Sequence, residues 1–119
     1  MHELSVCQAL MAQVVDIAAR ENAERVTAIV LRMGPLSGVE PDLLADAFPI
    51  AAAGTPAEGA ALHFERLPVR VHCSVCGAES DASVNRLLCG ACGDYRTRLI
   101  SGDELLLASV ELERRASAG

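Results

Sequence analysis

Two cysteine pairs constrain what this chain can fold into more than any other feature of its sequence. The first pair is Cys73 and Cys76, the second is Cys89 and Cys92, and the spacing is C-x2-C-x12-C-x2-C. Four thiolates on two tight turns match the tetrahedral sulfur shell of zinc, in which each Zn–S bond is about 2.3 Å. A glycine follows the second cysteine of each pair, and its access to positive φ lets the chain curl back toward the sulfurs. The pattern predicts a structural Zn(II) site in a small ribbon.

Two other interpretations of the cysteines stay open at this point. Iron in a rubredoxin-like site uses the same soft thiolates, so spacing alone does not separate it from zinc. Disulfides are disfavoured, because nothing else in the chain suggests export: the N-terminus lacks the basic and apolar regions of a signal peptide. No run approaches the roughly 20 apolar residues of a membrane span. We therefore expect a cytoplasmic protein with no membrane partner, whose thiols stay reduced and free for metal.

Composition and charge exclude several classes of function. Of 119 residues, 51% are hydrophobic, which is enough for one modest core. The net charge is −6, from 16 acidic and 10 basic residues, and such a charge repels phosphate backbones. The ribbon nevertheless holds four arginines, Arg70, Arg86, Arg96 and Arg98. No acid–base pair, phosphate-binding glycine loop or activated nucleophile is recognisable, so an enzyme is not expected. A zinc-ribbon module for protein or nucleic-acid interaction remains the alternative function.

Two helices are predicted outside the cysteine module. From Leu4 to about Asn22, apolar residues recur at helical spacing, and Cys7 lies on this stripe, so it is interpreted as a buried small hydrophobe. Pro41 suits the first position of a second helix that Glu40 could cap. Pro49 predicts a kink or a stop in that helix.

The strands define the fold. Three segments have the composition of strands: residues 25–33, residues 104–113 and the segment from Ala61 to a bend near Pro68. Residues 95–100 could add a short strand to the ribbon. We predict an α+β fold, a three-stranded antiparallel sheet with two helices on one face, plus an inserted zinc ribbon. Residues 1–70 and 103–119 would form the α/β domain and residues 71–102 the ribbon.

The first residues could chelate a metal ion. The terminal amine, the following amide nitrogens and the imidazole of His2 lie within a few bonds of one another. Nitrogen donors in a plane favour Ni(II) or Cu(II). A solvated histidine beside a helix N-terminus is the alternative, and Glu3 is also favourable there because of the helix dipole.

Several segments together resemble one family, the HypA/HybF hydrogenase nickel-insertion proteins. They are the Met-His-Glu-Leu-Ser start, the loop 36–41, the turn 54–59, the paired cysteines and the Gly-Asp-Glu-Leu of residues 102–105. The likeness covers nearly the whole chain, in the same order. It implies a nickel metallochaperone that is not an enzyme. Ni(II) would be cargo on His2, with backbone nitrogens and Glu3 assisting, in a nickel-binding α/β domain, and the four cysteines would hold structural Zn(II).

The resemblance also implies partners. A nickel-handling GTPase of the maturation pathway would exchange the metal, and the large-subunit precursor of a nickel–iron hydrogenase would receive it. The resemblance leaves a urease maturation role open as well, whereas no nucleic-acid partner is implied. Three other candidate residues are expected to have plain roles: His72 at a strand end, His63 on the surface and Glu40 as a helix cap, with metal contact as the alternative for His72 and Glu40.

Overall fold

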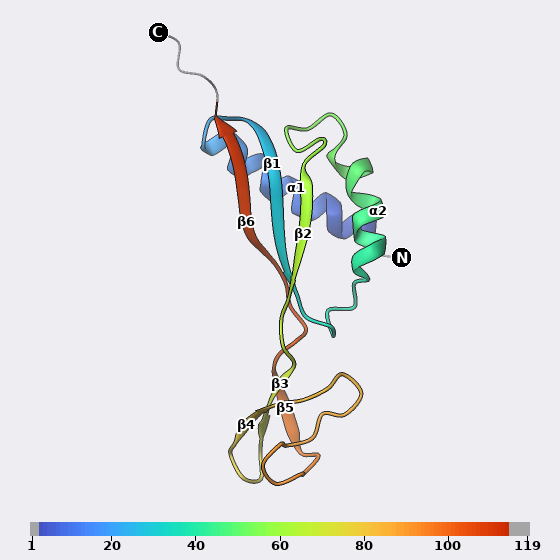
Figure 1. Cartoon of the computed structure of the whole chain (residues 1–119), viewed down its shortest axis with the longest axis vertical. Helices are drawn as coiled ribbons and strands as arrows, with labels where there is room; N and C mark the ends of the chain where they lie inside the picture. The colour runs from blue at the N-terminus through green and yellow to red at the C-terminus, as the bar shows by residue number, and fades with distance from the viewer. Residues whose placement is uncertain (1–2, 115–119) are drawn as a thin grey trace. The chain divides into compact units, whose positions relative to one another are not determined.

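The computed structural model describes residues 3–114, and the chain divides into two compact units. One unit holds the chain up to Leu31, Val39–Phe64 and the residues from Leu107 onward. The other holds Arg32–Gly38 and Glu65–Leu106. The first unit carries both helices, and the second carries the cysteine ribbon (Figure 1).

Helix α1 spans Glu3–Arg20 and buries one stripe. The spacing of the buried side chains follows the helical repeat, as the sequence predicts. The helix ends where Asn22 takes a positive φ of 52°, a conformation that asparagine tolerates and that often closes a helix. The buried residues of α1 are Cys7, Met11, Val14 and Ala18.

Helix α2 spans Pro41–Ala52 and continues through Pro49, so the predicted stop does not occur. Pro49 has no N–H to donate to the carbonyl oxygen of Ala45. Both residues are exposed, so water can donate a hydrogen bond to that oxygen instead. Pro41 takes the first position as predicted. Glu40 occupies the N-cap position, but its side chain makes no capping hydrogen bond.

Three strands form the sheet that the helices cover. Its order is β2-β1-β6, with β1 spanning Ala23–Met33, β2 spanning Ala61–Arg66 and β6 spanning Leu105–Arg114. The central strand β1 buries side chains on both faces, including Ala28 and Ile29 in succession. The predicted three-stranded sheet with two helices is therefore confirmed.

The strand directions differ from the predicted antiparallel arrangement, because the sheet is mixed. The Val26 N–H donates to the Pro56 carbonyl oxygen, and the Leu67 N–H donates to the Met33 carbonyl oxygen, so the paired residue numbers rise together. β1 and β2 are therefore parallel, while β6 runs in the opposite direction (Figure 1). The physical reason is that α2 forms a crossover between β1 and β2, and a helical crossover returns the chain to begin a parallel strand.

Both helices pack against the same face of β1. Leu44 of α2 is fully buried, and its carbonyl oxygen accepts a hydrogen bond from Cys7 Sγ of α1 at 3.4 Å. Ile29 and Leu31 of β1 are each 1% exposed. A small apolar pocket between these elements is lined by Cys7, Leu10, Met11, Ile29, Leu31, Leu44, Phe48 and Leu62.

The second unit contains a sheet of order β4-β3-β5. β3 spans Arg70–Cys73, β4 spans Glu79–Asp81 and β5 spans Thr97–Ser101, and β3 is antiparallel to both neighbours. Strand β4 was not predicted, because its three residues are polar and carry no hydrophobic period. It forms because the turn after Cys73 sends the chain back along β3.

None of the helices within residues 3–114 is long and apolar enough to cross a membrane.

Candidate metal centre

The first cysteine pair lies on a tight turn at the end of β3. Cys73 Sγ accepts hydrogen bonds from the N–H groups of Val75 at 3.3 Å and Cys76 at 3.4 Å. The Gly77 N–H donates to the Cys73 carbonyl oxygen at 3.0 Å, and Gly77 has a φ of 77°. A side chain at this φ would be strained, which explains the glycine after the second cysteine.

The second cysteine pair repeats this geometry. Cys89 Sγ accepts hydrogen bonds from the N–H groups of Ala91 at 3.3 Å and Cys92 at 3.4 Å. The Gly93 N–H donates to the Cys89 carbonyl oxygen at 2.9 Å, and Gly93 also has a φ of 77°. The two turns therefore present their sulfurs in equivalent ways, as the shared sequence pattern predicts.

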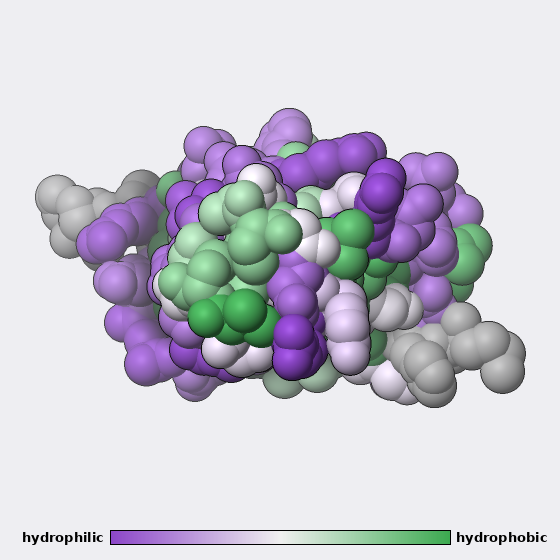
Figure 2. Space-filling view, turned by 90° about the horizontal axis from the view of Figure 1, so that it is seen from below, coloured by the Kyte–Doolittle hydropathy of each residue, from purple (hydrophilic) through white to green (hydrophobic). Residues whose placement is uncertain are grey.

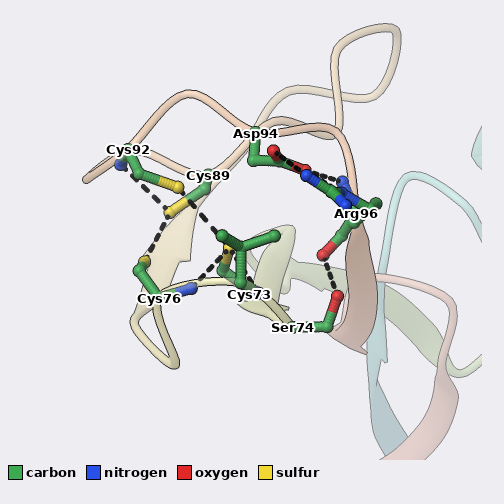
Figure 3. A network of polar contacts seen from close by, with 8 residues as sticks. Cys73, Ser74, Cys76, Cys89, Cys92, Asp94 and Arg96 are labelled. Carbon is green, nitrogen blue, oxygen red and sulfur yellow. Dashed lines mark hydrogen bonds and ion pairs between the residues drawn. The ribbon is translucent and has the colours of Figure 1, made fainter.

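The structure brings all four sulfurs together. The four Sγ atoms lie within 4.8 Å of one another, with Cys73 and Cys92 separated by 3.6 Å and Cys76 and Cys89 by 3.5 Å (Figure 3). Tetrahedral zinc with Zn–S bonds of about 2.3 Å would place its sulfurs about 3.8 Å apart. A disulfide would need about 2.05 Å, and all five cysteines are free thiols. The spacing fits a four-sulfur metal site.

The pKa values of the thiols differ within the cluster. The N–H groups of Cys92 and Ala91 lower the pKa of Cys89 to about 6. Those of Cys76 and Val75 also lower the pKa of Cys73, although loss of water opposes them. The Asp94 N–H lowers the pKa of Cys92, but loss of water and the neighbouring sulfurs outweigh it and raise that pKa to about 12. A bound cation would offset the charge of neighbouring thiolates and so favour the ionised form of all four sulfurs.

One side of the cluster is open to solvent. Cys73 and Cys89 are buried, whereas Cys76 and Cys92 are exposed. Viewed from the ribbon end, hydrophobic side chains form a patch among hydrophilic ones (Figure 2). Val75, between the first two cysteines, is 52% exposed. A metal here would be held by the chain but remain reachable by chelators.

The other candidate residues lie apart from the four sulfurs. His72 Nδ1 is buried without a hydrogen-bond partner and lies 4.0 Å from Glu79 Oε2. His63 is exposed on β2. Within residues 3–114, the cysteine cluster is the one group of histidine, cysteine and acidic side chains close enough to share a metal ion.

The predicted nickel residues begin the chain. His2 lies outside the described residues. Glu3 is the first residue of α1, where a carboxylate is favourable at the positive end of the helix dipole.

The contacts that surround the sulfurs were not predicted from the sequence. Ser74 donates both its N–H and its hydroxyl to the Arg96 carbonyl oxygen, and Arg96 forms an ion pair with Asp94 (Figure 3). Gly90 donates its N–H to Ser80 Oγ at 2.9 Å. The position of Asp94 two residues after Cys92 was the available signal, because aspartate there can accept hydrogen bonds from the following turn.

Comparisons with known proteins identify the family. The family model described as "Hydrogenase/urease nickel incorporation, metallochaperone, hypA" matches residues 1–112. The chain is 51% identical over 112 residues to hydrogenase maturation factor HypA of Nitrosospira multiformis, covering 94% of this chain and 97% of the relative. It is 43% identical over 113 residues to the protein of the same name from Aquifex aeolicus, covering 95% of this chain and 98% of the relative.

A solved structure supports the fold. The solution structure of the nickel metallochaperone HypA from Helicobacter pylori matches with a TM-score of 0.73 at 23% identity, covering 97% of this chain and all of that one. At this TM-score and coverage, the two chains share one fold over nearly their whole lengths. With the family model and close relatives spanning nearly the full length, the chain belongs to the HypA family of hydrogenase and urease nickel-incorporation metallochaperones.

Proposed function

We propose that this chain binds Ni(II) at its N-terminus and delivers it to a nickel–iron hydrogenase precursor during maturation. The observation that carries the proposal is the family match over residues 1–112, which includes the N-terminal residues. His2 supplies the imidazole, the opening backbone nitrogens complete the nitrogen donors, and Glu3 assists. An open site of few ligands suits a carrier, because the metal must leave as well as bind.

The second metal in the proposal is a structural Zn(II) held by Cys73, Cys76, Cys89 and Cys92. Its support is the spacing of the four sulfurs and the set of N–H donors aimed at two of them. Zinc in such sites is coupled to folding of the surrounding segment. The proposed functional division is a nickel-binding α/β domain of residues 1–70 and 103–119 and an inserted ribbon of residues 71–102.

Nickel titration of the untagged protein tests the site. In His2→Ala, calorimetry should show loss of nickel binding, because the imidazole is the main side-chain donor. His63→Ala is the matched control, since it removes an exposed histidine on β2 and should bind like the parent. Equal affinity of His2→Ala and the parent would exclude His2 as a ligand.

Two further changes separate the donors. An N-terminal extension should weaken nickel binding, because it displaces the terminal amine from the chelate. Acidification should also release nickel, since only neutral imidazole binds metal and a model imidazole titrates near a pKa of about 6.5. Nickel retention unchanged between pH 7.5 and pH 5.5 would argue against an imidazole ligand.

The proposed partners are a nickel-handling GTPase and the hydrogenase large-subunit precursor, met in the cytoplasm, where thiols remain reduced. The name shared by the relatives, hydrogenase maturation factor, supports this pathway. Cells that lack the gene should make hydrogenase precursor without nickel, and the parent gene should restore it while the His2→Ala version should not. Restored urease in place of hydrogenase would assign the recipient differently.

The ribbon charges weigh against the nucleic-acid alternative. Arg70 Nη1 lies 2.7 Å from Asp81 Oδ1, and Arg96 Nη2 lies 2.9 Å from Asp94 Oδ2. Two of the four ribbon arginines are therefore neutralised by acidic neighbours. A gel-shift titration at low salt should show no retained complex.

A further inference from the structure

The two cysteine turns are joined by contacts that do not involve metal. In the first turn, Ser74 donates its N–H at 2.9 Å and its hydroxyl at 2.7 Å to the Arg96 carbonyl oxygen. In the second turn, the Cys89 N–H donates to the Asp94 carbonyl oxygen at 3.0 Å. Asp94 and Arg96 therefore each contact one of the turns through the backbone.

The side chains of Asp94 and Arg96 connect these two contacts. Asp94 Oδ1 accepts hydrogen bonds from the Arg96 N–H at 2.8 Å and from its Nε at 2.9 Å, and Oδ2 accepts one from Nη2 at 2.9 Å. This fork, with the backbone bond beside it, fixes the conformation of residues 94–96. It holds the Arg96 carbonyl where Ser74 meets it (Figure 3).

We propose that Asp94 and Arg96 form a clasp that positions the second cysteine pair against the first, and so sets how tightly and how long the ribbon holds zinc. The proposal rests on the zinc site proposed above. The clasp belongs to the second turn only. In the first turn the equivalent residue is Ala78, whose carbonyl oxygen accepts a hydrogen bond from the Cys73 N–H at 2.9 Å. Alanine has no side chain that could extend this contact.

A second ion pair in the ribbon provides a matched control. Arg70 Nη1 lies 2.7 Å from Asp81 Oδ1, but these residues join β3 to β4 and are hydrogen-bonded to neither cysteine turn by their side chains. The Asp81 side chain is 77% exposed, whereas that of Asp94 is 20% exposed. Removing either carboxylate changes the net charge equally, so a loss of zinc affinity in one variant alone cannot come from net charge.

Zinc competition with a chromophoric chelator tests the clasp in the full chain. Asp94→Asn should weaken zinc binding by about 10–100-fold, the usual effect of losing an outer partner of a metal site, and should speed zinc loss to excess chelator. Asp81→Asn should stay within about twofold of the parent. Co(II) bound to Asp94→Asn should keep the absorption of a tetrahedral four-sulfur site, because no ligand is removed.

Arg96→Lys separates positioning from charge. Lysine keeps the positive charge but lacks the planar fork, so the clasp predicts weakening similar to that of Asp94→Asn. If Arg96→Lys binds zinc like the parent while Arg96→Gln is weak, charge alone acts and the clasp is refuted. Asp94→Asn with parent affinity, or no weaker than Asp81→Asn, refutes it too.

Ser74→Ala tests the clasp if Asp94→Asn fails to fold. It removes only the hydroxyl bond to the Arg96 carbonyl and should weaken zinc binding by severalfold; no change would overturn the proposal. Failure of the zinc site itself gives a different result, in which the parent chain shows no four-sulfur Co(II) spectrum.

Discussion

Gly34 lies against the backbone of Gly102, and this contact makes Gly34→Ala a demanding test of the structure. A Cβ atom at residue 34 would lie 2.1 Å from both the carbonyl carbon and the carbonyl oxygen of Gly102. Ordinary contacts begin near 3.4 Å, so the two backbones must separate by more than 1 Å. The atoms that must move are backbone atoms, which cannot change rotamer to relieve the overlap.

The cost has two parts. Overpacking of this kind usually destabilises a protein by about 1–3 kcal/mol. Separation would also weaken the hydrogen bonds from the Gly34 N–H to the Glu104 carbonyl oxygen, at 2.9 Å, and from the Leu36 N–H to the Gly102 carbonyl oxygen, at 2.7 Å. Each bond contributes about 1 kcal/mol, which brings the expected loss to about 3–5 kcal/mol.

Thermal unfolding of the zinc-loaded chain, followed by circular dichroism, measures this loss. At about 4 °C per kcal/mol, Gly34→Ala should melt about 12–20 °C below the parent. Gly38→Ala is the control in the same loop, because Gly38 has a φ of +80° with nothing within 4 Å of its added Cβ. It should cost only about 1–2 kcal/mol of backbone strain. If Gly34→Ala melts no lower than Gly38→Ala, the close backbone contact is wrong.

Three other perturbations have defined outcomes. Leu44→Ala should lower the free energy of unfolding by about 2–5 kcal/mol in denaturant titration, since Leu44 is fully buried between the helices and β1; a loss below about 1 kcal/mol would contradict that packing. Burial raises the pKa of the Cys7 thiol above its value in the unfolded chain, so the stability that it contributes is present below pH 9 and is lost as pH rises further. Cys7→Ala should remove this alkaline component from a plot of stability against pH, and an unchanged slope would refute it. Chelation of zinc should abolish the ordered ribbon while the helical circular dichroism of α1 and α2 persists; concerted loss of both signals would show that the two units unfold together.

Much of the fold followed from local patterns. The stripe through Cys7, Met11, Val14 and Ala18 predicted α1, and the alternation of Leu62 and Phe64 with polar neighbours predicted β2. Of the kink or stop expected at Pro49, the stop does not occur, and the parallel direction of β2 was missed. An exposed proline is tolerated where its lost hydrogen bond faces water, and strand direction depends on which way the α2 crossover returns the chain.

The sequence by itself determined the four-sulfur cluster of the ribbon. Two short spacings and two following glycines specify turns in which the sulfurs and the N–H groups belong to neighbouring residues, so local geometry is sufficient. Tertiary structure alone decided which distant residues meet. Ser74 is hydrogen-bonded to Arg96, 22 positions away, and Gly34 packs against Gly102 across a still longer interval, away from the sulfurs. No short-range pattern encodes such pairs, because they arise only when strands distant in the chain pack side by side.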